Sequence, residues 1–328
     1  MHSTDRREFL RWLGAGALGA AFSGISGAES GKPMRGVFPI GQTPFTADDR
    51  LDLDSLAGEV KFCNRGGVSG FAWPQIASGW STLSEKERLD GAETILAAGK
   101  GGRTSLVIGV QTQGSDVEGA IRYAKHAARN GADAVISLPP AKAAGPAVVE
   151  YYKTIGAATE LPLIVQSTGD MSVDLIVEML RQIPTMKCVK DEAGNPLLRI
   201  TEIRERTNDK LAVFSGNGVR TMIDEMRLGF AGHCPFTGLA DLYQSTFDLW
   251  HSGKRREAFD MFGRIQAFSS IPGVASYILV ARGVFKETTR TRPTPGIDGG
   301  RVPPPLEEAQ KQVIRQALAD YLKPYLRA

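Results

Sequence analysis

Cysteine and histidine are scarce in this chain. Its 328 residues include three cysteines and four histidines. The cysteines, Cys63, Cys188 and Cys234, lie in apolar segments and have no spacing typical of a metal site or of a disulfide framework. We therefore expect no metal centre and no obligatory disulfide.

A glycine-rich phosphate loop is also lacking. The first predicted strand is followed by the segment GQTPFTADDR, which does not have the glycine spacing of a dinucleotide-binding turn. An open, doubly wound sheet usually has such a loop, so this architecture is disfavoured. No cofactor is expected.

The chain has no excess of charge of one sign. Its 39 basic and 36 acidic residues give a net charge of +3 and are spread along the sequence. Nucleic-acid-binding proteins usually gather their basic residues into a stripe or patch. We therefore expect no nucleic-acid partner.

The N-terminus has its own pattern. Arg6 and Arg7 precede Phe9 and Leu10, and a run of alanine, glycine and leucine follows. This order is typical of a secretory signal, and the arginine pair favours the twin-arginine type. An amphipathic or membrane-anchoring helix is the alternative, although the apolar run is short for a span. We predict an export signal over 1–30, a periplasmic or secreted protein, and no stable membrane insertion once the signal is removed.

Short apolar runs alternate with amphipathic stretches through most of the remaining sequence. The runs are apolar on both faces and the connections are of helical length, which predicts parallel strands with helices packed outside. Eight such units favour a (β/α)₈ TIM barrel over 33–240, followed by a C-terminal helical region over 241–328. The strands are expected at 36–44, 70–74, 104–110, 134–139, 162–167, 186–190, 211–216 and 232–236.

A lysine stands at the end of the sixth predicted strand, in the segment PTMKCVKDEAGN. The active site of a TIM barrel lies at the carboxyl ends of its strands. Met186, Cys188 and Lys190 alternate onto one strand face, so Lys190 is predicted to point into the barrel mouth. Desolvation disfavours an ammonium ion and favours the neutral amine that attacks carbonyl groups. The alternative is a structural ion pair between Lys190 and Asp191 or Glu192.

The strand ends also follow a recognisable order. In sequence they read TPF, GWSTLSEKER, VIGVQTQGSDVEGAIRYAKHAARNGADAVISLPP, LPLIVQSTG, VKDEAGN, FSGNG and GFAGHCPF. This order resembles that of the dihydrodipicolinate synthase and N-acetylneuraminate lyase family over about residues 35–240. The resemblance implies a TIM barrel, often tetrameric, whose lysine forms a Schiff base with pyruvate or a related 2-oxo acid. Lys190 occupies the position of that lysine.

Several positions differ from the pattern that the resemblance implies. The family has a proton-relaying tyrosine at the end of the fifth strand, where this chain has Gln166, and an amide has no titratable proton. The tyrosine pair expected after the fourth strand is replaced by PPAKAAG. The carboxylate-binding loop corresponds to QIASG, which includes Ala77 and Ser78. The substrate-binding residues that we predict are Thr43, Ala77, Ser78, Gly216, Asn217 and Cys234.

Another residue would then have to move protons. His233 is the one histidine at a predicted strand end, and its near-neutral titration would suit a proton shuttle. A hydrogen-bonded core histidine is the alternative. Asp191 or Glu192 could also act as a base if it is buried.

We therefore predict a class I aldolase-like lyase or synthase that acts on a 2-oxo acid or related carbonyl compound. Lys190, Gln166 and His233 are its predicted catalytic residues, and a homo-oligomer, dimer or tetramer, is expected. The alternative is a non-catalytic periplasmic barrel of the same descent that binds a small molecule.

Overall fold

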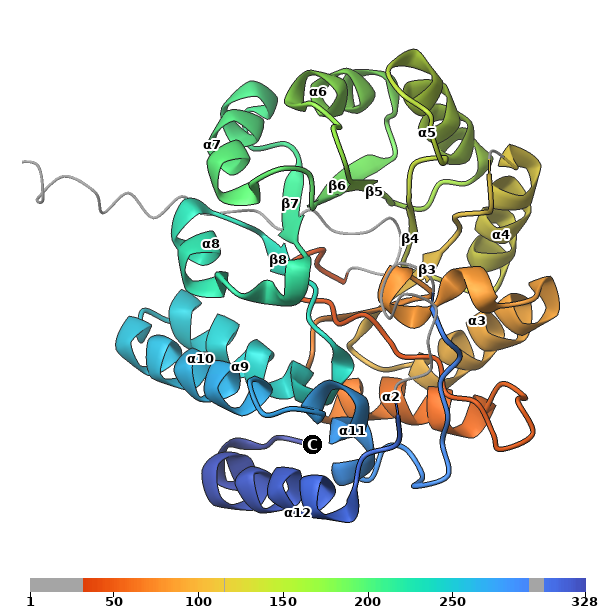
Figure 1. The fold of residues 1–328 in the computed structure, drawn as a ribbon. Helices are drawn as coiled ribbons and strands as arrows, with labels where there is room; N and C mark the ends of the chain where they lie inside the picture. Colours follow the sequence, from red (N-terminus) through yellow and green to blue (C-terminus); the bar gives the residue numbers. More distant parts are fainter. Residues whose placement is uncertain (1–31, 115, 295–303) are drawn as a thin grey trace, which may run out of the picture.

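The computed structural model describes residues 32–114, 116–294 and 304–328. Eight parallel strands stand in the order β1-β8-β7-β6-β5-β4-β3-β2 at the centre of the molecule (Figure 1). Ile40, just after β1, forms parallel bridges with both Ala72 and Phe236 and so connects the two ends of this order. The predicted TIM barrel is confirmed. Its strands are β1 (Gly36–Val37), β2 (Gly70–Trp73), β3 (Ser105–Gly109), β4 (Ala134–Ser137), β5 (Leu163–Ser167), β6 (Met186–Asp191), β7 (Ala212–Ser215) and β8 (Gly232–His233).

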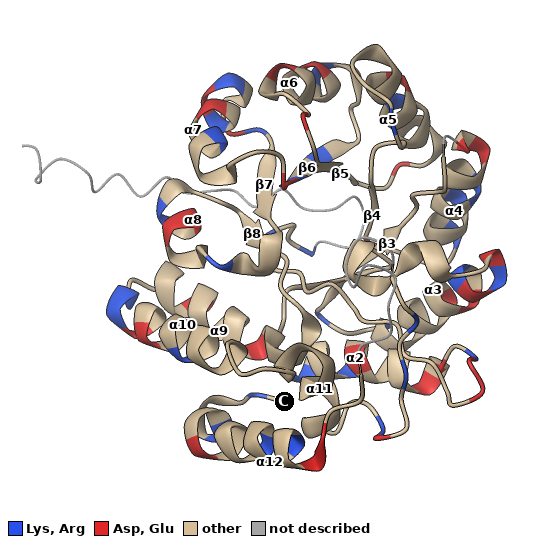
Figure 2. Ribbon diagram, viewed as in Figure 1, with Lys and Arg blue, Asp and Glu red and all other residues tan. Residues whose placement is uncertain are grey.

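A helix follows each strand and lies outside the barrel (Figure 1). In the view of Figure 2, acidic and basic residues are interspersed along these outer helices. Most residues of the strands are neither acidic nor basic. The helices are α2 (Leu53–Arg65), α3 (Glu85–Gly99), α4 (Val117–Arg129), α5 (Pro146–Ala158), α6 (Val173–Gln182), α7 (Pro196–Thr207), α8 (Met222–Leu228) and α9 (Ala240–His251).

Local sequence explains where several helices begin and end. Ser84 and Glu87 form a capping box at the start of α3, in which each side chain binds the backbone N–H of the other residue. The α4 helix begins at Val117, because Asp116 is its N-cap and accepts a hydrogen bond from Gly119 N at 2.8 Å.

The core has two layers, and their boundary is the sheet itself. One buried cluster fills the barrel and includes Phe38, Ile136, Cys188 and Phe214. A larger cluster fills the space between the strands and the outer helices. Because successive strand residues point to opposite faces, membership in one cluster or the other tells which way each side chain points.

One prediction about strand faces was wrong. Met186 belongs to the outer cluster, not to the barrel interior with Cys188. The register between β5 and β6 shifts here, since Leu163 pairs with Met186 but Ile164 pairs with Cys188. This irregularity inserts one residue into β6 and reverses the alternation before Cys188.

The C-terminal residues form helices, and these gather on one side of the barrel (Figure 1). They are α10 (Arg255–Ser269), which packs on α9, α11 (Val274–Ala281), and α12 (Glu308–Ala317), which packs on α11. Within the described ranges, no helix combines the length and apolar character needed to cross a membrane. The predicted export signal lies outside these ranges.

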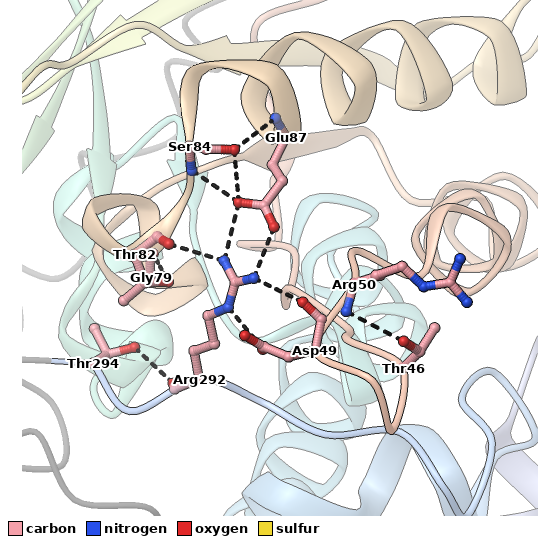
Figure 3. A network of polar contacts seen from close by, with 9 residues as sticks. All are labelled: Thr46, Asp49, Arg50, Gly79, Thr82, Ser84, Glu87, Arg292 and Thr294. Carbon is pink, nitrogen blue, oxygen red and sulfur yellow. Dashed lines mark hydrogen bonds and ion pairs between the residues drawn. The ribbon is translucent and has the colours of Figure 1, made fainter.

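A segment after α11, residues 286–294, is tied to the loops that follow β1 and β2 (Figure 3). Phe45 and Arg290 exchange backbone hydrogen bonds, both 2.9 Å long. The Arg292 guanidinium binds Asp49 Oδ1 at 2.9 Å and Glu87 Oε1 at 2.8 Å, and it lies over the Phe45 ring. We call residues 286–294 the strap. It connects the C-terminal region to the strand ends where a barrel active site forms.

Candidate active site

Lys190 and Gln166 face each other across neighbouring strands. The β5 and β6 strands pair with Gln166 directly opposite Lys190. Both residues are buried. The structure therefore brings these two predicted catalytic residues together at the carboxyl end of the barrel.

Glu192 is the residue that joins them. Its Oε2 lies 3.0 Å from Lys190 Nζ and also accepts a hydrogen bond from Gln166 Nε2. Its Oε1 accepts a hydrogen bond from the backbone N–H of Asn217 at 3.1 Å. One carboxylate thus receives donors from the ends of three adjacent strands.

Gly216 makes room for this carboxylate. A Cβ atom at position 216 would overlap Glu192 Oε1. The backbone of Gly216 has a φ of −125°, so the need for glycine is steric and does not arise from a left-handed conformation. Gly216 and Asn217, both predicted to bind substrate, hold Glu192 in place.

The charge of Glu192 follows from its partners. Burial alone would raise the pKa of this carboxyl, but the Lys190 ammonium and the hydrogen bonds from Lys190, Asn217 and Gln166 outweigh burial and hold the pKa below its ordinary value. Glu192 is therefore a carboxylate at neutral pH in this arrangement.

Asp191 has a different environment, although it is adjacent in sequence. Its Oδ2 lies 3.1 Å from Arg199 Nε, and Arg199 belongs to α7 in the outer layer. Burial raises the pKa of Asp191 despite the pairing with Arg199. Of the two acidic residues considered as bases, only Glu192 contacts Lys190 among the described contacts.

Cys234 lies in the barrel interior, in the same buried cluster as Cys188. Burial raises the pKa of its thiol to about 12, although the Lys190 ammonium acts in the opposite direction. At neutral pH Cys234 is therefore a protonated, apolar neighbour of the lysine.

His233 points the other way from Cys234. Its Nδ1 lies 2.8 Å from Glu225 Oε2, and its ring is near Phe230 and Phe247 in the outer layer. Strand residues alternate between faces, so an inward Cys234 directs His233 outward. The structure does not bring His233 together with Lys190, and the geometry gives no support to the predicted proton shuttle.

Thr43 and Ser78 use their hydroxyl groups within the protein. Thr43 Oγ1 donates to Ser78 O at 2.5 Å and accepts from Trp73 Nε1 at 2.9 Å. Ser78 Oγ donates to Gly41 O at 2.6 Å. These bonds connect the loops after β1 and β2 at the level of the predicted carboxylate site.

Ala77 lies beside Ser78 in a short 3₁₀ helix, Ile76–Ser78, and packs against the barrel-interior cluster. Its methyl group offers contact area but no hydrogen bond. Among the described residues, no group of three or more histidine, cysteine, aspartate or glutamate side chains could hold a metal ion.

Comparison with known proteins agrees with this arrangement. The model of the dihydrodipicolinate synthetase family matches residues 33–272. The chain belongs to this family. The match includes all eight strands and the Lys190 site.

Relatives in the dihydrodipicolinate synthetase family include synthases and lyases. The 4-hydroxy-tetrahydrodipicolinate synthase of Methanosarcina mazei is 32% identical over 197 residues, which cover 58% of this chain and 65% of that relative. The N-acetylneuraminate lyase of Rhizobium meliloti is 27% identical over 306 residues, which cover 88% and 96%.

Solved structures of the family have the same fold. Dihydrodipicolinate synthase from Rhodopseudomonas palustris superposes with a TM-score of 0.74 at 21% identity and covers 87% of this chain and 97% of that one. Sialic acid aldolase from Ruminococcus gnavus has a TM-score of 0.74 at 18% identity and covers 89% and 99%.

Proposed function

We propose that this protein is a Schiff-base enzyme, a class I aldolase-like lyase or synthase acting on a 2-oxo acid or related carbonyl compound. Lys190 is its nucleophile. One observation carries this proposal: Lys190 is a buried amine at a barrel strand end, 3.0 Å from a carboxylate that can accept its proton. Family membership and a related sialic acid aldolase with a catalytic lysine support it.

The chemistry needs an electron sink. Attack of the neutral Lys190 amine on a carbonyl carbon, followed by protonation and loss of water, gives an iminium ion. The iminium withdraws electrons from the adjacent carbon, so a bond between that carbon and its neighbour can break or form through an enamine. The anionic Glu192 lies where it would stabilise the positive iminium nitrogen.

Gln166 suits a binding role in this reaction. A carboxylate only accepts hydrogen bonds, so the amide nitrogen must face Glu192, and Oε1 is directed elsewhere. This buried Oε1 has no hydrogen-bond partner among the described residues. A substrate hydroxyl group would satisfy it, which favours a hydroxylated substrate.

Reductive trapping tests the proposal. The purified protein is incubated with borohydride and, in separate samples, pyruvate, 2-oxobutyrate, glyoxylate or acetaldehyde, and the labelled residue is identified by peptide mass. We expect a stable adduct on Lys190 with at least one carbonyl compound and none in Lys190→Ala. Lys187→Ala is the matched control, because Lys187 lies on the same strand but bonds to Pro184 O outside the site. Absence of any Lys190 adduct in the wild-type protein would overturn the proposal.

A non-catalytic binding barrel is the second candidate. Two observations favour it: position 166, where the resemblance implies a relay tyrosine, carries an amide, and the hydroxyls of Thr43 and Ser78 already bind the protein itself. Such a protein would bind its ligand with an affinity that survives Lys190→Ala, measured by calorimetry, and would form no borohydride adduct.

We further propose export to the periplasm and assembly into a dimer or tetramer. Export is supported by Arg6 and Arg7 ahead of the apolar run. In cell fractionation, the Arg6→Lys, Arg7→Lys double substitution should retain the protein in the cytoplasm.

The proposed assembly is tested by light scattering. The purified protein should have a mass of two or four chains, and a monomer mass would contradict the assembly.

A further inference from the structure

The Lys190 site has a carboxylate in direct contact with the reacting nitrogen. We propose that Glu192 is a catalytic residue that transfers protons between the Lys190 nitrogen and the bound carbonyl group during Schiff-base formation. This inference rests on the proposed Schiff-base function and assigns proton transfer to Glu192, since the neighbouring Gln166 has no titratable proton.

Geometry singles out Glu192 from the titratable groups around the amine. Cys234 keeps its proton at neutral pH, because its pKa is raised to about 12. Asp191 is paired with Arg199, and His233 is paired with Glu225, both in the outer layer. Gln166 contacts Glu192 but cannot titrate.

The two oxygens of Glu192 have different surroundings. Oε1 is anchored by the Asn217 N–H and fits into the space left by Gly216. Oε2 faces Lys190 Nζ and Gln166 Nε2, which are both donors. Oε2 is therefore the oxygen that exchanges protons, and Oε1 fixes its position.

The proposed step balances in atoms and charge. Glu192 Oε2 takes a proton from the Lys190 ammonium, and the freed lone pair attacks the carbonyl carbon, which leaves a positive nitrogen and a negative oxygen. Glu192 gives its proton to that oxygen and takes one from the nitrogen, so the product is a neutral carbinolamine. Glu192 then returns a proton to the carbinolamine oxygen, the C–O bond breaks, and water leaves. An ammonium ion and a carbonyl group have become an iminium ion and one water molecule, and Glu192 is a carboxylate again.

The hydrogen-bond arrangement favours return of the proton. In the adduct first formed by the attack, the Lys190 nitrogen is positive and has no free lone pair, and in the carbinolamine its lone pair forms the C=N bond as water leaves. Gln166 Nε2 is also a donor and offers no acceptor. A proton on Oε2 is therefore directed to the oxygen of the reacting group.

The test uses the carbonyl compound from the panel that labels the wild-type protein fastest. The rate of Lys190 adduct formation is measured by quenched borohydride trapping in the wild-type protein, Glu192→Gln and Glu192→Asp. We expect Glu192→Gln to slow adduct formation by roughly 10²-fold, the range of general acid–base catalysis. Glu192→Asp, which keeps a carboxyl group, should recover part of the rate.

A role for Glu192 that is limited to neutralising the Lys190 ammonium predicts the opposite change in the rate of adduct formation. If Glu192 only neutralised the ammonium, its removal would leave more neutral amine in the buried site, and adducts would form faster. An unchanged or faster rate in Glu192→Gln, with Lys190 still labelled, would overturn the proton-transfer role and leave the Schiff-base function standing. Failure of the wild-type protein to label would overturn both.

Glu225→Gln is the matched control for loss of a buried carboxylate. Glu225 bonds to His233 and Ser215 on the outer side of the barrel. Its substitution should leave the adduct rate near that of the wild-type protein. Thermal melts of all variants distinguish a slower reaction from a lost fold.

Discussion

At the scale of single residues, Gly216 has a role that depends entirely on its neighbour. Glu192 Oε1 occupies the space of a side chain at position 216. A methyl group there must displace the carboxylate that contacts Lys190. The glycine is thus part of the site although it offers no side-chain chemistry.

Gly216→Ala should therefore impair adduct formation without unfolding the barrel. We expect a loss of roughly 10²-fold in the Lys190 trapping rate, as is typical when a reacting group is misplaced by about 1 Å. Gly263→Ala is the control, because a Cβ atom at Gly263 in α10 meets no neighbouring atom within 4 Å. A wild-type rate in Gly216→Ala would show that the position of Glu192 is unimportant.

Residue-level prediction from the sequence succeeded where alternation was clear. Lys190 and Cys188 share the barrel interior, and the same two-residue period directs Glu192 toward that side. This period was the available signal for Glu192. It also applied to His233, because Cys234 follows it directly and neighbouring strand residues point to opposite faces, so these two predicted site residues could not both face the barrel interior.

At the scale of secondary-structure elements, the strap connects the C-terminal region to the loops after β1 and β2. Arg292 provides most of the side-chain bonds, to Asp49, Glu87 and Thr82 O. Glu87 also completes the capping box of α3, so one carboxylate serves both the strap and a helix start (Figure 3).

Arg292→Ala should loosen this connection. Hydrogen bonds to charged groups contribute about 1.5–3 kcal/mol when buried, and less near the surface, so we expect the free energy of unfolding to fall by about 1–2 kcal/mol. Urea denaturation measures the change. Arg50→Ala, in the loop after β1 that the strap contacts but with an exposed side chain, should alter stability by less than about 0.5 kcal/mol. Equal effects of the two substitutions would contradict a stabilising strap.

The order of elements was predictable because strand and helix periods differ and caps mark the helix starts. Ser84 followed three residues later by Glu87 is a sequence signature of a helix start, and α3 begins there. The strap was not predictable. Its bonds join residues that are more than 200 positions apart, as Arg292 and Asp49 are, and no local pattern encodes such a contact.

At the scale of the whole molecule, a buried acid links stability to pH. Glu59 in α2 is fully buried and accepts a hydrogen bond from Gln42 N at 3.1 Å. Burial raises the pKa of Glu59 from 4.5 to about 8. Between these values the folded protein keeps a proton that the unfolded chain releases. Stability from this residue is therefore present below pH 4.5 and is lost as pH rises toward 8.

Glu59→Gln should remove this dependence. The wild-type protein should lose up to about 1.4 kcal/mol per pH unit across this window relative to the variant. Urea unfolding at pH 5, 6.5 and 8 measures the difference, and the exposed Glu257→Gln is the control. Parallel pH profiles for the wild-type protein and Glu59→Gln would contradict a neutral buried Glu59.

The contact between Lys190 and Glu192 also determines how strongly the site attracts a charged substrate at long range. The two opposite charges, 3.0 Å apart, form a dipole whose field decays faster than that of a single ammonium ion. An anionic substrate therefore gains little long-range attraction from this pair. Capture would rely on short-range fit, and the association rate should change little with ionic strength.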